Sequence, residues 1–134
     1  MIDRIKKHEG LRLKPYRCTA GKLTIGYGRN LEDNGITEEE AHFLLMNDLE
    51  KSWDECCKAF SWISKMDKIR QGVIVELCFN MGLGRLKGFK KMLAACERGD
   101  YETASVEMLD SLWARQVGQR AKTLADIMKG KDNA

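Results

Sequence analysis

The sequence contains a single proline, Pro15, and no run of about 18 consecutive apolar residues. With so little proline, long stretches of the chain are free to form helices. The lack of a long apolar run excludes a transmembrane helix. Charged residues interrupt the apolar ones in residues 1–9, which excludes the apolar core of a signal peptide. We therefore expect the protein to stay in the cytoplasm until another agent releases it.

Cysteine spacings typical of metal or redox sites are also missing. The number of cysteines is odd, and no CxxC pair occurs among Cys18, Cys56, Cys57, Cys78 and Cys96. The two histidines, His8 and His42, are far apart in the sequence. We therefore expect reduced thiols in a reducing compartment, with no disulfide framework, no metal site and no cofactor.

The length and the charge pattern indicate one domain with an anionic partner. The chain has 134 residues, of which 43% are hydrophobic and 32% charged, with a net charge of +3. Residues 1–29 carry a net charge of +6, residues 30–58 carry −7, and residues 59–134 carry +4. Basic surface on both sides of an acidic segment suits an anionic polymer, either nucleic acid or bacterial cell wall.

The first nine residues predict a short helix, residues 2–9, because Ile2, Ile5 and Glu9 share one helical face. Gly10 is placed to end this helix. Glu9 would then lie at the negative end of the helix dipole and be partly buried, and both effects favour the protonated carboxyl group. A carboxyl group that keeps its proton near neutral pH can act as a general acid, although an ordinary solvated glutamate fits these residues as well.

Residues 11–29 predict a β-hairpin with a turn near Ala20-Gly21. In its second strand, Leu23, Ile25 and Tyr27 share one face, and Thr24, Gly26 and Gly28 share the other. A face with two glycines has no side chains to fill it, so that either packed backbone or a ligand approaches there. Cys18 lies on the face of Thr24 only if the hairpin loop has an odd number of residues. Otherwise Cys18 is most simply a small buried side chain.

The remainder of the chain predicts helices. Residues Thr37–Glu40 form a capping box, which begins a helix that should extend to about Ala59. A second helix should begin at Asp67, end at Met81 before Gly82, and lie buried at the centre of the helices. Shorter helices are expected near 86–97, 101–110 and 114–129. The predicted fold is α+β: a single domain, 1–134, with a small β lobe at about 10–36, a connecting helix at about 37–59, and a helical lobe at about 60–134 that includes helix 2–9.

Two stretches resemble the bacteriophage-type lysozymes of glycoside hydrolase family 24: His8–Tyr16 and Thr19–Gly28. That family has a glutamate, eight residues, an aspartate or cysteine, five residues and a threonine. Glu9, Cys18 and Thr24 match this spacing. Phe79–Gly82 with Gly84 and Gly88-Phe89, and Trp113 with Gln116 and Arg120–Lys122, resemble the family's central helix and C-terminal signature.

The resemblance implies a lysozyme-like fold and hydrolysis of the β-1,4 bond between N-acetylmuramic acid and N-acetylglucosamine. By analogy, Glu9 donates a proton to the leaving oxygen, while Cys18 and Thr24 position or activate the attacking water, with inversion at the anomeric carbon. Many members have aspartate at position 18. A thiol with a pKa of about 8.5 is a poor charged base at neutral pH unless a nearby cation such as Arg17 lowers it. Cys18 thus has three open roles: thiolate base, covalent nucleophile with a retaining outcome, or weak orientation of water.

The resemblance also points to residues outside the catalytic motif. Asn30, Phe79 and Asn80 fall where the family lines its substrate cleft. Trp113 fits a core position better than a sugar platform. Arg120 is a candidate partner for Glu9, and such an ion pair would favour the ionised carboxylate.

The sequence therefore predicts an endolysin, a muramidase that degrades bacterial peptidoglycan during phage-induced lysis of its host. Without an export signal it would need a holin, a membrane-disrupting partner, to pass from the host cytoplasm to the periplasmic wall. We expect a monomer that does not bind nucleic acid, because the basic residues at 85–91 lack a helix-turn-helix context. The alternatives are a peptidoglycan-binding module with impaired catalysis, a helical nucleic-acid binder, and a cysteine hydrolase that uses Cys18.

Overall fold

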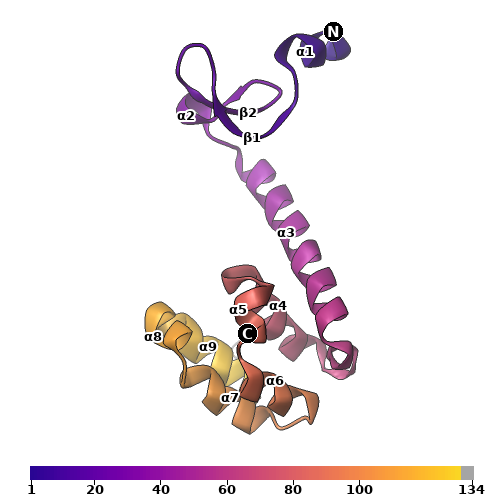
Figure 1. Ribbon diagram of the computed structural model, residues 1–134, viewed down its shortest axis with the longest axis vertical. Coiled ribbons are helices and arrows are strands. Elements are labelled where there is room, and N and C mark those ends of the chain that lie inside the picture. The colour runs from indigo at the N-terminus through magenta and orange to yellow at the C-terminus, as the bar shows by residue number, and fades with distance from the viewer. Residues whose placement is uncertain (131–134) are drawn as a thin grey trace. The chain divides into compact units, whose positions relative to one another are not determined.

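The computed structural model describes residues 1–130, which form two compact units: residues 1–44, and the described residues from Leu45 onward. The elements of the first unit are α1 (Ile2–Glu9), β1 (Arg12–Arg17), β2 (Leu23–Gly26), β3 (Arg29–Asn30), α2 (Leu31–Asn34) and the start of α3 (Glu38–Ala59). The second unit contains the rest of α3, a 3₁₀ helix η1 (Ser61–Lys65), α4 (Lys68–Met81), α5 (Leu83–Lys87), α6 (Lys90–Glu97), α7 (Tyr101–Leu109), α8 (Leu112–Val117) and α9 (Gln119–Lys129). Figure 1 shows these elements.

The predicted α+β class is confirmed. Helices make up most of the chain, and the three strands form a small antiparallel sheet in the order β1-β2-β3. How the chain divides into lobes stays a prediction, although the boundary between the two compact units falls inside α3.

Helix α1 ends where the sequence predicts, because the N–H of Gly10 donates to the carbonyl of Lys6 at 2.9 Å. The expected partial burial of Glu9 is wrong, and the helical face that it shares with Ile2 and Ile5 is exposed. Ile2 is 65% exposed, Ile5 is 45% exposed, and Glu9 is also exposed. The small sheet of this unit has few apolar side chains with which to cover the face of a two-turn helix.

The hairpin between β1 and β2 has an odd-numbered loop. Tyr16 lies opposite Thr24, and the N–H of Cys18 donates to the carbonyl of Lys22 at 3.0 Å, which leaves residues 19–21 as the loop. Since side chains alternate along a strand, Cys18 and Thr24 lie on the same face. The predicted condition for this arrangement is therefore met.

A register shift interrupts the pairing of β1 with β2 between Arg12 and Tyr16. Pro15 lies inside this stretch. Proline has no N–H to donate to a neighbouring strand, so regular strand pairing is unfavourable at this position.

The structure also contains β3 and the four-residue helix α2, neither of which the residue pattern predicts. Asn30 begins this helix, and its side-chain oxygen accepts a hydrogen bond from the N–H of Asp33 at 3.0 Å. Glu32 and Asp33 lie in the first turn of α2, where acidic side chains are favourable.

The predicted capping box at the start of α3 is confirmed. The N–H of Glu40 donates to the hydroxyl of Thr37 at 3.1 Å, and the N–H of Thr37 donates to the carboxylate of Glu40 at 2.9 Å. The same carboxylate binds the guanidinium of Arg29 through two hydrogen bonds, of 2.8 and 2.7 Å. The start of α3 is thereby attached to β3.

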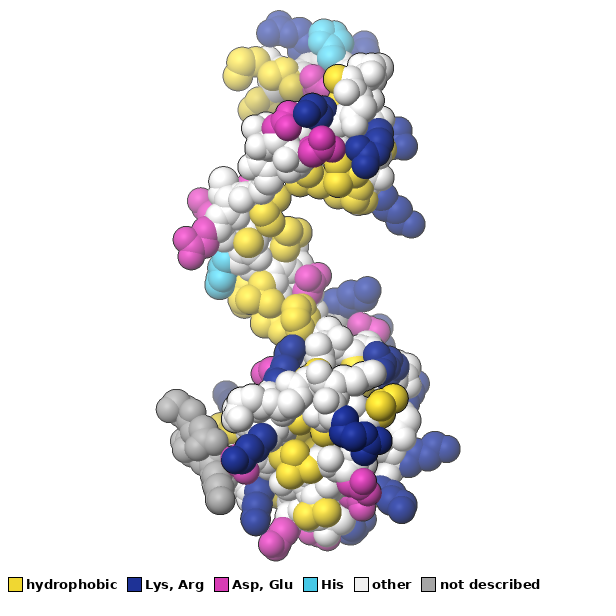
Figure 2. Space-filling view, turned by 90° about the vertical axis from the view of Figure 1, so that its left-hand side faces the viewer, with side chains coloured by type: hydrophobic (Ala, Val, Ile, Leu, Met, Phe, Trp, Pro, Cys, Tyr) yellow, Lys and Arg dark blue, Asp and Glu magenta, His cyan; other side chains and the backbone are white. Residues whose placement is uncertain are grey.

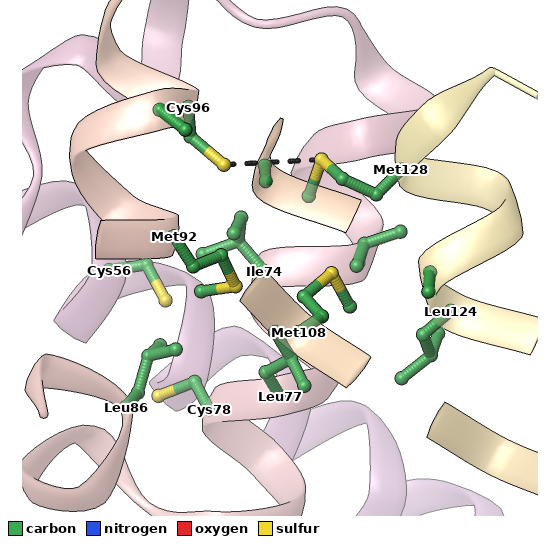
Figure 3. Packing of buried hydrophobic residues seen from close by; sticks show 14 of the residues in the cluster. Cys56, Ile74, Leu77, Cys78, Leu86, Met92, Cys96, Met108, Leu124 and Met128 are labelled. Atoms are coloured by element: carbon green, nitrogen blue, oxygen red, sulfur yellow. Dashed lines mark hydrogen bonds between the residues drawn. The ribbon is translucent and has the colours of Figure 1, made fainter. Parts of the chain in front are cut away.

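Helix α4 lies at the centre of the hydrophobic core in the second unit, as predicted. Asp67 caps its first turn by accepting from the N–H of Arg70 at 3.0 Å, and Gly82 ends it. Figure 3 shows Ile74, Leu77 and Cys78 of this helix packed against side chains from α3, α5, α6, α7 and α9. This core is rich in sulfur, with buried residues Cys56, Met66, Cys78, Met92, Cys96, Met108 and Met128.

Two of the predicted shorter helices are each divided in the structure. The segment 86–97 breaks between α5 and α6 at Gly88-Phe89, and the segment 114–129 breaks between α8 and α9 at Gly118. Within residues 1–130 no helix is long and apolar enough to cross a membrane. All five cysteines belong to this part of the chain, and each is a free thiol there.

Candidate active site

The carboxyl group of Glu9 lies against the backbone of Gly28. A methyl group placed on Gly28 would be 2.9 Å from Cδ of Glu9 and closer still to its Oε2. This distance is shorter than real Cβ atoms tolerate. The last turn of α1 therefore presents its carboxyl group to the turn between β2 and β3, which contains Tyr27 and Gly28. The predicted strand face shared by Gly26 and Gly28 is wrong at this point, because β2 ends at Gly26.

Cys18 and Thr24 are connected through one carbonyl group. The carbonyl of Lys22 accepts from the N–H of Cys18 at 3.0 Å and from the hydroxyl of Thr24 at 2.8 Å. Thr24 is buried, with 4% of its surface exposed, whereas Cys18 is half-buried. The hydroxyl of Thr24 thus donates to Lys22 while Cys18 is neutral, and its oxygen lone pairs can accept a hydrogen bond. The same proton can turn toward the sulfur when Cys18 is a thiolate.

The pKa of the Cys18 thiol is lowered from its ordinary value. The backbone of Lys22 is the largest cause and the backbone of Ala20 the second, because hydrogen bonds to the sulfur favour the thiolate. Partial burial acts in the opposite direction, and the side chain of Thr24 adds a smaller lowering. Arg17, the cation considered from the sequence, is not among these causes, and its guanidinium binds Glu32 at 3.3 Å.

Acidic residues of α2 hold the tip of the hairpin. Glu32 accepts from the N–H of Leu23 and from Arg17, both at 3.3 Å, and Lys22 binds Asp33 at 3.2 Å. These contacts are exposed, and each contributes little stability alone. Together they restrict the loop that carries Cys18.

The predicted substrate contacts have other partners in the structure. Asn30 caps α2, and its amide nitrogen donates to the carboxylate of Asp33 at 3.0 Å. The side-chain oxygen of Asn80 accepts from the indole N–H of Trp113 at 2.7 Å. Trp113 is 5% exposed, as expected for a core residue. Contact of Asn30 and Asn80 with substrate stays a prediction.

Phe79 lines a pocket of about 890 Å³ in the second unit. Its ring is 42% exposed, and Trp53 of α3 and Arg120 of α9 also line this pocket. Arg120 donates to the carboxylate of Glu76 at 3.0 Å. The predicted pairing of Arg120 with Glu9 stays a prediction.

Gly28 and Lys22 are the contributors that sequence reasoning missed. The alternation of Gly26 and Gly28 did signal a close approach, but it did not show that Glu9 is the group that approaches. The role of the Lys22 carbonyl depends on the length of the hairpin loop, which the residue pattern left open. Over residues 1–130 no cluster of side chains has the composition of a metal site.

The carboxyl group against Gly28, and the thiol and hydroxyl that share the carbonyl of Lys22, thus all belong to residues 1–44. Comparison with known proteins adds a decisive observation, because residues 6–128 match the family model described as phage lysozyme. The chain belongs to the phage lysozyme family. The α+β fold is accordingly lysozyme-like, and membership indicates a glycoside hydrolase acting on peptidoglycan.

Individual relatives agree with the family match. The chain is 32% identical to an endolysin of Acyrthosiphon pisum secondary endosymbiont phage 1, across 87% of this chain and 80% of that protein. It is 26% identical to the probable T4-type lysozyme 1 of Dictyostelium discoideum, across 95% of this chain and 92% of that protein.

A third relative is a much longer protein. The chain is 31% identical to the pre-baseplate central spike protein Gp5 of Enterobacteria phage T4 across 96% of its own length, yet spans only 27% of that protein. Sequences similar to this chain therefore occur both as nearly whole proteins and as part of a larger one.

Proposed function

We propose that the protein is a muramidase that hydrolyses the β-1,4 bond between N-acetylmuramic acid and N-acetylglucosamine in bacterial peptidoglycan. The observation that carries this proposal is the site of residues 1–44. Glu9 lies against Gly28 in the turn between β2 and β3, and Cys18 and Thr24 share the carbonyl of Lys22. Their sequence spacing is that of the catalytic residues in this family.

In the proposed reaction Glu9 protonates the glycosidic oxygen as the bond to the anomeric carbon breaks. Water attacks the anomeric carbon from the opposite face of the ring and loses its proton to a base. Thr24 is suited to orient this water, since its oxygen retains lone pairs while its proton is donated to Lys22 or to Cys18. The product then has an inverted anomeric centre.

The role of Cys18 distinguishes this chain from members with aspartate at the same position. A lowered pKa increases the fraction of thiolate near neutral pH, which favours Cys18 as the base that receives the proton from water. The same thiolate is also a nucleophile. Attack by sulfur on the anomeric carbon would form a thioglycosyl intermediate, and its hydrolysis would give retention of configuration.

Surface charge supports a polyanionic substrate. Lys and Arg side chains are scattered over the face of the second unit seen in Figure 2, together with fewer acidic ones. Arg85, Lys87, Lys90 and Lys91 fall within seven residues that contain no acidic residue. Such charges attract anionic wall polymers, and the attraction should weaken with salt.

We further propose that the enzyme acts as an endolysin. It would accumulate in the cytoplasm of a host bacterium and reach the periplasmic wall once a holin has opened the membrane. Similarity to a phage endolysin over 87% of the chain supports this role. Expression in Escherichia coli should cause lysis only when the inner membrane is permeabilised, and lysis without permeabilisation would contradict the need for a holin.

Glu9→Gln tests the proposed function directly. The variant keeps the size and shape of the side chain but removes its acidic proton, and general acids contribute about 10²–10⁴-fold to rate. We expect a loss in that range when purified peptidoglycan is digested, with an unchanged circular dichroism spectrum. Glu39→Gln, an exposed carboxyl group in the first turn of α3, is the matched control and should retain full activity.

Two results of this experiment would count against the proposal. Normal activity of Glu9→Gln would show that Glu9 is not the acid. An inactive wild-type protein that still binds peptidoglycan would indicate a binding module with impaired catalysis. Early-time NMR of the product then separates the two roles of Cys18, because an inverted anomer indicates a base and a retained anomer indicates a nucleophile.

A second candidate function is a wall-cleaving module of a phage particle. The specific observation in its favour is the match to a spike protein of which the chain spans 27%. If a phage encodes the chain, mass spectrometry of its purified particles would support this function by detecting peptides of the chain within a longer protein. Detection of the chain only in the soluble lysate would favour the endolysin.

A further inference from the structure

Gly28 contacts Glu9 in a way that no other residue type permits. Its φ angle is +75°, a conformation that side chains rarely adopt, and a methyl group there would overlap the carboxyl group of Glu9. The carboxyl group therefore occupies the space that a side chain at position 28 would take. The backbone of residue 28 limits how far Glu9 can approach the hairpin.

Tyr27, the residue before Gly28, contacts the turn of α1 that contains Glu9. The ammonium group of Lys6 lies 5.2 Å from the centre of the Tyr27 ring, a cation–π contact. Lys6 and Glu9 are three residues apart and thus lie on the same side of the helix. Two consecutive hairpin residues, Tyr27 and Gly28, consequently contact two side chains from one turn of α1.

We propose that Tyr27 and Gly28 are positioning residues that set the location of the Glu9 carboxyl group for proton transfer. This inference rests on the proposed function of Glu9 as the general acid. Tyr27 holds the last turn of α1 through its contact with Lys6. Gly28 has no side chain and therefore leaves room for the carboxyl group of Glu9 beside its backbone. Catalysis depends on such placement, because an error of about 1 Å can reduce a rate by roughly 10²-fold.

Gly26, the last residue of β2, supplies a matched control two residues away. Its φ angle is +70°, so that an alanine there meets almost the same backbone strain as an alanine at position 28. A methyl group on Gly26, however, would have no atom within 4 Å. The two glycine-to-alanine variants thus differ mainly in whether the new methyl group displaces Glu9.

The experiment compares Gly28→Ala with Gly26→Ala on purified peptidoglycan, together with melting temperature and the pH profile of kcat. We expect both variants to lose similar stability. Gly28→Ala should lower kcat by about 10²-fold with KM changed by less than about 3-fold. It should also change the pH profile of kcat, because the methyl group displaces the carboxyl group of Glu9 from its contact with residue 28. Gly26→Ala should keep kcat within about 3-fold and leave the profile unchanged.

Substitutions of Tyr27 test the second contact. Tyr27→Leu removes the aromatic ring that Lys6 faces, and we expect kcat to fall by about 3–10-fold. Tyr27→Phe keeps the ring and should restore kcat to near the wild-type value. Equal losses in the two Tyr27 variants would show that the cation–π contact does not position Glu9.

The outcomes separate this inference from the proposed function. If Glu9→Gln is inactive but Gly28→Ala and Gly26→Ala have the same kcat and pH profile, Glu9 remains the acid and the positioning role of Gly28 is overturned. If Glu9→Gln is fully active, the proposed function itself fails. If only Gly28→Ala changes kcat and the pH profile, the positioning role is supported.

Discussion

Residues 1–44 and residues 45–130 bury their side chains to very different extents. In the first unit Thr24 is the one buried residue, and the contacts that hold its elements are hydrogen bonds and ion pairs such as Arg29–Glu40 and Arg17–Glu32. In the second unit a continuous apolar core includes fully buried side chains from α3 through α9. Short segments expose most of their surface and cannot build such a core alone.

The residues that stabilise the fold and the residues proposed for catalysis therefore lie in different parts of the chain. The residues proposed for catalysis belong to the unit with almost no core, where backbone hydrogen bonds and charge determine their positions. The second unit contributes the buried apolar surface that stabilises the fold. Substitutions in residues 45–130 should therefore change mainly the free energy of unfolding, whereas those near Glu9 and Cys18 should change mainly activity.

Truncation of Leu77 should have the largest effect on stability. This side chain is fully buried on α4, and Leu77→Ala leaves a cavity that costs about 2–5 kcal/mol of unfolding free energy. Ile69→Ala is the control on the same helix, because Ile69 is 58% exposed and its truncation should cost less than about 0.5 kcal/mol. Urea denaturation measures both values, and equal losses would contradict the role of Leu77 in the buried core of the second unit.

A smaller loss is expected for Asn80→Ala. The variant leaves the indole N–H of Trp113 without its acceptor, which costs about 1–3 kcal/mol because Trp113 is buried. Asn80→Asp keeps an acceptor and should lose less. KM for peptidoglycan, measured in both variants, tests the predicted substrate contact: an unchanged KM would leave Asn80 with a structural role only.

Glu40→Gln should give a modest, pH-dependent decrease in stability. The hydrogen bonds from Arg29, with help from Thr37, lower the pKa of Glu40 to about 2. Because this pKa is below that of an unfolded glutamate, about 4.3, the ionised carboxylate stabilises the fold above that pH and loses this effect as the pH falls toward 2. Glutamine at position 40 can still complete the capping box.

Melting curves at several pH values test this expectation. The wild-type protein should exceed Glu40→Gln in melting temperature at pH 7, and the difference should shrink steadily between pH 4.5 and about pH 2. Glu39→Gln provides the comparison without an ion pair. A difference that does not depend on pH would show that the Arg29–Glu40 pair contributes nothing through charge.

The smallest expected effect is a shift in the reactivity of Cys18. Its pKa is lowered by hydrogen bonds from the backbone of Lys22 and Ala20, so that alkylation by iodoacetamide should reach its half-maximal rate below the usual thiol range of about 8.5. The measurement is made in the Cys57→Ser variant, because Cys57 on α3 is exposed and would also react. Adding Thr24→Val should raise the midpoint slightly, and a midpoint of 9 or above in the parent would contradict a lowered pKa.

The sequence predicted well the elements whose signals are local. Asp67 and Gly82 mark the ends of α4, Thr37 and Glu40 form the capping box, and Gly10 ends α1, because each of these residues acts on neighbouring backbone groups. The spacing of the proposed catalytic residues was likewise visible. Their roles stay predictions until they are tested.

Features that depend on contacts between distant residues could not be predicted. The bond between Asn80 and Trp113 joins residues 33 positions apart, and nothing near Asn80 in the sequence indicates its partner. Helix α2 has only four residues and therefore no periodic pattern to detect. The exposure of Ile2 and Ile5 was not predicted either, because the spacing of apolar residues along a helix does not show whether another surface covers them.

The register shift around Pro15 has a consequence for how the protein behaves at high concentration. Strand β1 lies at one side of the three-stranded sheet, where a regular strand would offer a row of unpaired N–H and C=O groups to another molecule. A proline and an irregular backbone at this edge, flanked by Lys14 and Arg17, make such intermolecular β-pairing unfavourable. The same residue that interrupts the hairpin thus protects the exposed sheet against aggregation.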